Sequence, residues 1–182
     1  MLNNMDTISL NIKDSIINTI KRENEELGSL HNKGVFFLPE LTISYLVGKD
    51  LVKNAIEIFN SKIKNWYPEY TVGSRGPSDL YIELENNNKY VFEFKTRQTS
   101  ESYISDIKKL IELDSSFEKY FCAFIDCFEN IAPNDKRILN TENIIGESIT
   151  RVSIDNSFNY FVTKDHARVK NVVCIVGLWK IK

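Results

Sequence analysis

The segment "GPSDLYIELENNNKYVFEFKTRQ", residues 76–98, contains the clearest structural signals in the chain. Two runs within it, 78–85 and 89–96, alternate apolar and polar residues, which is typical of β-strands with one buried face. Three asparagines, 86–88, separate the runs, and asparagine clusters favour turns. The stretch therefore predicts a β-hairpin with one apolar and one polar face.

Pairing the two runs about Asn87 predicts which residues face each other. A slip of one residue would set each apolar row against a polar one, so the pattern indicates which rows share a face. The predicted apolar pairs are Leu80 with Phe94, Ile82 with Phe92, and Leu84 with Tyr90. On the opposite face the same register places Asp79 opposite Lys95, and Tyr81 opposite Glu93.

The polar face carries residues that suit metal chemistry. Asp79 and Glu93 would converge from adjacent strands, and Mg²⁺ is a hard cation that prefers oxygen ligands. The backbone carbonyl of Phe94 could supply a further ligand. A bound metal polarises a phosphodiester and lowers the pKa of its water, and Lys95 could position that water and offset charge in the transition state. The simpler alternative is a solvated face with cross-strand pairs such as Asp79 with Lys95.

"PSD" (77–79) followed by "EFK" (93–95) resembles the motif of the PD-(D/E)XK nuclease superfamily, which includes restriction endonucleases, junction resolvases and RecB-type nucleases. The resemblance implies a restriction-endonuclease-like α/β fold, in which helices flank a mixed sheet of about four to six strands. It implies the core order αβββαβ over about residues 35–128. It assigns catalysis to Asp79, Glu93 and Lys95, and metal binding to both carboxylates.

The same resemblance points to two further residues and also has departures. Glu40 in "FFLPELTISYLVG" matches a glutamate that many members place on the first core helix, near the metals, and Gln98 matches a polar position just past the third strand. Ser78 stands where a proline is expected, although Pro77 is one residue away. The helix "ESYISDIKKL" lacks the Q-x-x-x-Y pattern of RecB-type members, and residues 130–182 contain no recognisable motif.

The whole chain of 182 residues reads as one domain. Apolar residues at helical spacing predict a helix over 9–27 that ends at Gly28, and a longer helical region over 36–63 that starts near Pro39 and can break at Gly48. Further predicted elements are a strand at 66–72, a helix capped by Thr99 or Ser100, a buried strand at 119–128, a short helix at 136–143, a strand pair at 151–163 and a last strand at 171–181. Residues 130–182 form a variable α/β tail.

Composition narrows the class of protein. A net charge of -2 and a pI of about 5.8 exclude a histone-like chain but leave room for local basic patches. Three cysteines without a CxxC pair argue against structural zinc and favour reduced thiols in the cytoplasm. No apolar run reaches the length of a membrane span. Residues that could contact phosphates are Lys62, Lys64, Arg75, Lys164, His166, Arg168 and Lys170. Trp66 and Trp179 read as core residues.

We therefore expect a Mg²⁺-dependent endonuclease that hydrolyses DNA and leaves 5′-phosphate ends, with Mn²⁺ able to substitute. The restriction, repair and mobile-element roles stay open. A homodimer is expected by analogy, since cutting both strands usually needs two active sites. One alternative is a catalytically inactive module of the same fold that binds DNA or a protein. Another is a protein-binding domain such as an inhibitor. A second acid-x-lysine triplet, Asp106-Ile107-Lys108, falls on a predicted helix and is set aside.

Overall fold

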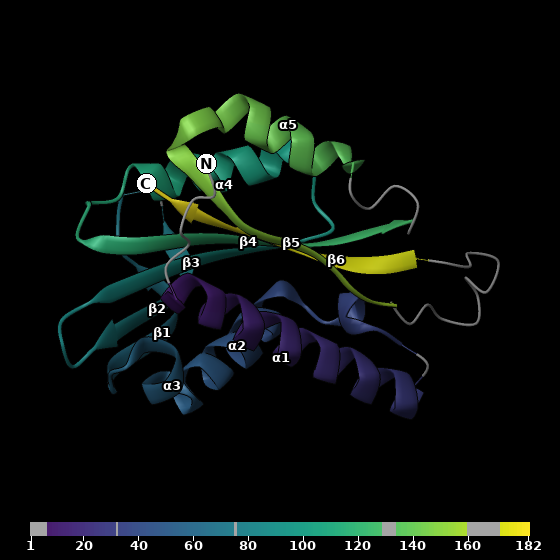
Figure 1. Ribbon diagram of the computed structural model, residues 1–182, viewed down its shortest axis with the longest axis horizontal. Coiled ribbons are helices and arrows are strands. Elements are labelled where there is room, and N and C mark those ends of the chain that lie inside the picture. The colour runs from purple at the N-terminus through teal and green to yellow at the C-terminus, as the bar shows by residue number, and fades with distance from the viewer. Residues whose placement is uncertain (1–6, 32, 75, 129–133, 160–171) are drawn as a thin grey trace.

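The computed structural model describes residues 7–31, 33–74, 76–128, 134–159 and 172–182. Six strands form one mixed sheet between two layers of helices (Figure 1). The helices are α1 (Thr7–His31), η1 (Val35–Phe37), α2 (Glu40–Lys53), α3 (Ala55–Phe59), α4 (Ser100–Ile111), α5 (Lys136–Ile145) and η3 (Gly146–Ser148). The strands are β1 (Ile63–Thr71), β2 (Pro77–Leu84), β3 (Lys89–Thr96), β4 (Phe117–Phe128), β5 (Ile149–Asn159) and β6 (Val172–Ile181). The predicted mixed α/β fold is confirmed at this level.

The strands lie in the order β1-β2-β3-β4-β6-β5. All neighbouring pairs are antiparallel except β3 and β4, which run parallel. A parallel pair needs a crossover connection, and α4 supplies it. As predicted, β4 is an interior strand, because an almost unbroken run of apolar side chains suits burial on both faces. One strand, β5, covers the described part of the predicted strand pair; residues 160–163 lie outside the described residues.

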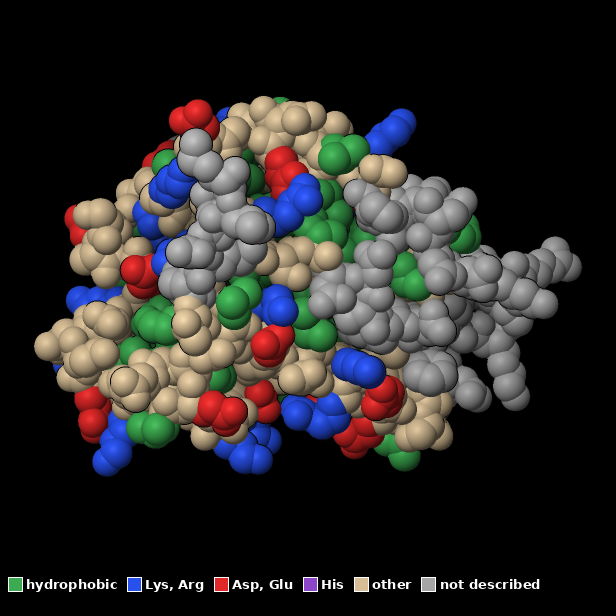
Figure 2. Space-filling view, in the orientation of Figure 1, with side chains coloured by type: hydrophobic (Ala, Val, Ile, Leu, Met, Phe, Trp, Pro, Cys, Tyr) green, Lys and Arg blue, Asp and Glu red, His purple; other side chains and the backbone are tan. Residues whose placement is uncertain are grey.

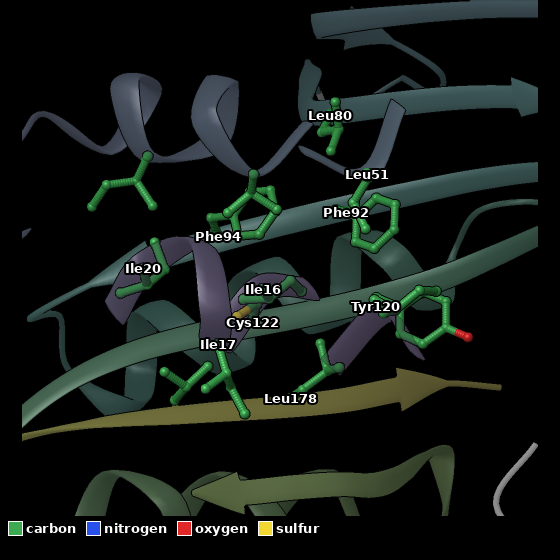
Figure 3. Close-up of a cluster of buried hydrophobic side chains, with 14 of the residues drawn as sticks. Ile16, Ile17, Ile20, Leu51, Leu80, Phe92, Phe94, Tyr120, Cys122 and Leu178 are labelled. Carbon is green, nitrogen blue, oxygen red and sulfur yellow. The ribbon is translucent and has the colours of Figure 1, made fainter. Parts of the chain in front are cut away.

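Two apolar cores fill the spaces on either side of the sheet. One core packs α1, α2 and α3 against the sheet face that carries Leu80, Phe92 and Phe94, all fully buried (Figure 3). The other core lies under α4 and α5 and includes Tyr81, Val91 and Phe121 among its buried residues. The apolar row of the hairpin therefore packs where it was predicted to pack. The opposite face is not a simple solvated surface, because α4 covers part of it.

The predicted hairpin register is wrong by two residues. Leu80 pairs with Phe92 and not with Phe94. Ile82 pairs with Tyr90 and not with Phe92. The turn is centred on Asn86 and not on Asn87: Asn86 Oδ1 accepts the Asn88 amide at 3.1 Å, and Asn87 takes a left-handed φ of 67°. Because side chains alternate with period two, a shift of two keeps every residue on its predicted face.

Two predicted helix breaks are also wrong. Helix α1 runs through Gly28 to His31, since one glycine costs only about 1 kcal/mol in a helix that packing already holds. Helix α2 runs through Gly48, and the chain breaks instead at Asn54, between α2 and α3. A Cβ at Gly48 would lie 2.8 Å from Leu80 Cδ1, so this glycine lets the helix approach the sheet closely.

Other local predictions are confirmed. Thr99 caps α4 by accepting the Ser102 amide, and Trp179 is fully buried. Cys122 and Cys174 are buried free thiols, whereas Cys127 is only partly buried. No helix within the described ranges is both long and apolar enough to cross a membrane.

Candidate active site

The candidate site lies where β2 begins and β3 ends. Asp79 is the third residue of β2, and Glu93 and Lys95 lie two residues apart near the end of β3. The paired stretch of the hairpin reaches Leu80 and Phe92, and beyond it Asp79 Oδ2 accepts the Phe94 amide at 2.7 Å. The Asp79 carboxylate therefore holds β2 and β3 together at the point where the side chains of Glu93 and Lys95 project from β3.

Glu40 reaches this site from another element. Its position at the first turn of α2 places Oε1 3.1 Å from Lys95 Nζ, while Oε2 accepts the Thr96 amide at 2.9 Å. These bonds tie the start of α2 to the end of β3. The sequence separates Glu40 from Lys95 by a helix break and two strands, and the fold brings together these two residues, both of which the resemblance assigns to the site.

Lys95 has a second carboxylate partner, Asp106 on α4. Asp106 Oδ2 lies 3.0 Å from Lys95 Nζ. Burial alone favours the neutral amine, but the contacts with Asp106 and Glu40 outweigh it and raise the pKa of Lys95. Lys95 is therefore a protonated ammonium at neutral pH, and it can donate hydrogen bonds but cannot accept a proton. The simple Asp79–Lys95 pair of the solvated-face alternative is not how Lys95 is held.

Glu93 is the most deeply buried acid of the site, with 3% of its surface exposed. Its Oε1 lies 2.6 Å from the Nζ of Lys109, another α4 residue. Burial first, and repulsion from Asp79 second, raise the pKa of Glu93 to about 7, although Lys109 acts in the opposite direction. The positive charge near Glu93 is thus too small to offset the cost of ionising this buried carboxyl group.

The pKa of Asp79 is raised as well. Burial is the main cause, and it exceeds the stabilisation of the carboxylate by the Phe94 amide and by Lys95. Two neighbouring acids with raised pKa values are a common feature of functional sites, because the same geometry that disfavours two negative charges favours a cation between them.

The contacts at the site bear on whether it could hold a magnesium ion. Among the residues that the structure describes, no group of three or more His, Cys, Asp or Glu side chains is gathered to hold a metal. Mg²⁺ commonly takes only one or two carboxylates and completes its shell with water and substrate phosphates. Asp79 and Glu93 fit that pattern, since the charge of Asp79 lies close enough to raise the pKa of Glu93. The Phe94 backbone lies between Glu93 and Lys95, while the Phe94 side chain is fully buried in the opposite core.

Sequence reasoning missed Asp106 and Lys109. Asp106 was set aside because its triplet falls on a helix, yet the fold brings its side chain to Lys95. A signal was available: the buried face of α4 includes Tyr103, Ile107 and Leu110. Residues 106 and 109 flank that face at helical spacing, so charged side chains there lie against the sheet edge. Which strand residues they meet depends on the packing of α4 across the sheet.

The remaining predicted residues lie apart from this cluster or outside the described residues. Gln98 is exposed in the turn between β3 and α4. Lys62 lies just before β1 and Lys64 is the second residue of β1; both are exposed, and Lys64 Nζ is bound to Glu83 at 2.9 Å. On the face shown in Figure 2, acidic and basic side chains are interspersed and no single basic patch stands out. Arg75, Lys164, His166, Arg168 and Lys170 lie outside the described residues.

Comparison of the chain with protein-family models, with curated protein sequences and with solved structures gave no match.

Proposed function

We propose that this protein is a Mg²⁺-dependent nuclease of the PD-(D/E)XK type that hydrolyses DNA phosphodiester bonds. One observation carries the proposal: Asp79, Glu93, Lys95 and Glu40 come from three separate elements and gather around the end of β3. The element order from α2 to β4, in which α2 and the short α3 precede three strands, a helix and a strand, supports a restriction-endonuclease-like core.

The roles follow from the chemistry of each group. Asp79 and Glu93 would hold the metal, and the Phe94 carbonyl would be a third protein ligand. When bound, the metal supplies Lewis acidity toward the phosphate and lowers the pKa of a water ligand. Lys95 stays protonated, so it donates hydrogen bonds to the attacking water or to the phosphate and does not act as the base. Glu40 and Asp106 hold its Nζ in place from two sides.

Plasmid cleavage tests the proposal. The wild-type protein should nick or linearise plasmid with Mg²⁺ or Mn²⁺, and Lys95→Ala should reduce the rate by roughly 100-fold or more, as for loss of a preorganised donor. Lys108→Ala is a matched control, because Lys108 belongs to the other acid-x-lysine triplet and is exposed on α4. Circular dichroism must show that both variants are folded. Full activity of purified Lys95→Ala would refute the assignment.

A binding module without turnover is the second candidate. The observation that favours it is the ion pair of Lys109 with Glu93, in which an ammonium occupies a position that a metal ion would need. Calorimetry separates the two: heat of Mg²⁺ or Mn²⁺ binding that disappears in Asp79→Asn supports the nuclease, whereas no binding with or without DNA supports the module.

A further inference from the structure

Three tyrosines form a stack on β1 and β2, close to the candidate site. The Tyr70 ring lies 4.7 Å from that of Tyr81 and 5.0 Å from that of Tyr67, and the rings are tilted by only 29° and 19°. Tyr81 is buried, but 43% of Tyr67 and 41% of Tyr70 are exposed. The stack thus has a fixed inner ring and two outer rings that face solvent.

The position of Tyr70 requires an unusual backbone. Residues 67 and 70 are an odd number apart, so a regular strand would point them to opposite faces. Glu69 between them has a left-handed φ of 54°, which is unfavourable for a residue with a Cβ. The Tyr70 ring nevertheless lies over Tyr67 and Tyr81. Strained residues of this kind persist where the surrounding structure requires them, and here the result is an aromatic surface.

The stack lies beside the candidate metal ligands. Tyr70 is paired with Ser78, the residue before Asp79, and Tyr67 is paired with Tyr81, two residues after Asp79. Tyr81 and Asp79 point to the same face of β2, and their Cα atoms are about 7 Å apart in a strand. A nucleotide adjacent to a phosphate at Asp79 would therefore reach the exposed rings.

The charge around the rings is compatible with a polyanion. Glu83 is an acid on the same face, and its two oxygens are bound by Lys64 at 2.9 Å and Asn65 at 2.8 Å. These bonds, together with the nearby charge of Lys89, lower the pKa of Glu83. The carboxylate beside the stack is thus offset by two lysines, and the rings themselves are neutral.

We propose that Tyr67 and Tyr70 form a stacking platform for unpaired bases next to the scissile phosphate. Exposed aromatic rings stack on bases of any sequence, because every base has a π-face. Inside a duplex that face is covered by neighbouring base pairs. The substrate class is therefore single-stranded DNA, or the unpaired strand of a flap or frayed end. This choice of ligand rests on the proposed nuclease function.

Binding of fluorescently labelled oligothymidine tests the platform. Anisotropy is measured with Mg²⁺ in the Lys95→Ala background, so that binding is read without cleavage. Oligothymidine should bind more tightly than a thymine–adenine duplex of equal length. Tyr67→Ala and Tyr70→Ala should each weaken it about tenfold. Tyr70→Phe should retain binding, whereas Tyr70→Leu, which keeps the apolar contact but has no π-face, should lose it.

Tyr45→Ala is the matched control, since Tyr45 on α2 is equally exposed, at 46%, but belongs to a separate contact with Trp66. Unchanged oligothymidine binding in folded Tyr67 and Tyr70 variants, or equally tight duplex binding, would overturn the platform. If the wild-type protein cleaves DNA and these variants bind normally, the nuclease proposal is supported and the platform proposal is refuted. If tyrosine-dependent binding occurs and the wild type cleaves nothing, the platform stands and the nuclease proposal fails.

Discussion

Replacing Glu93 with glutamine tests whether the candidate site carries an excess of negative charge. In the folded protein the pKa of Glu93 is about 7, against an ordinary value of 4.5, because burial and the Asp79 carboxylate disfavour ionisation. Each unit of difference in pKa corresponds to about 1.4 kcal/mol. Fully ionised Glu93 therefore disfavours the folded state by about 3.5 kcal/mol.

The direction of the pH effect depends on whether the folded or the unfolded chain keeps the Glu93 proton. Below the unfolded pKa the group is protonated in both states, and the penalty is absent. As pH rises toward the folded pKa, the unfolded chain ionises first, so the free energy of unfolding of the wild type falls. Glutamine does not titrate. The stability of Glu93→Gln relative to the wild type should therefore increase by about 2.5 kcal/mol between about pH 5 and about pH 8.

Urea unfolding followed by circular dichroism, with EDTA present, measures this difference. Adding Mg²⁺ at the higher pH should stabilise the wild type more than Glu93→Gln, because a cation relieves the repulsion between Glu93 and Asp79. Glu83→Gln is the control, since Asn65 and Lys64 lower the pKa of Glu83. Glu83 is therefore ionised in both the folded and the unfolded chain between about pH 5 and about pH 8, and the stability of Glu83→Gln relative to the wild type should stay nearly constant over this range. A difference in stability between Glu93→Gln and the wild type that does not vary with pH would contradict the raised pKa of Glu93.

Three further changes test the parts that support the site. Asp106→Asn removes one anionic partner of Lys95, so it should lower the Lys95 pKa and reduce DNA cleavage roughly tenfold, with a changed pH–rate profile; an unchanged profile would contradict this. Thr99→Ala removes the cap of α4 and should cost about 1 kcal/mol in urea unfolding; no loss would show that the cap is dispensable. Gly177→Ala would place a Cβ 2.5 Å from the buried Trp179 ring and should cost about 1–3 kcal/mol, with a lower Tm; an equally stable variant would show that the ring can move.

Much of the hairpin was predictable because its signals are local. Alternation with period two assigned Leu80, Ile82 and Phe92 to one face and Asp79 and Glu93 to the other, and the structure retains that assignment. The register itself was not predictable, because three consecutive asparagines allow more than one turn. The observed turn depends on the left-handed φ of Asn87 and on the Asn86 side chain.

Helix ends were predicted less well for a related reason. Gly28 and Gly48 are helix breakers by propensity, but a preference of about 1 kcal/mol is smaller than the packing energy of a buried helix face. At Gly48 the glycine serves a tertiary purpose, since it lets α2 approach Leu80 on β2. The sequence does not reveal that neighbour.

The amino-acid pattern alone predicts which residues alternate, which faces are apolar, and that Asp79, Glu93 and Lys95 share one side of the hairpin. The side chains that contact these three residues depend on how the helices pack on the sheet. Asp106 and Lys109 come to Lys95 and Glu93 because α4 crosses back over the sheet between β3 and the parallel strand β4. Local periodicity sets the direction of a side chain, whereas ion pairs across elements and the raised pKa of Glu93 depend on burial and on distances that only the packed chain defines.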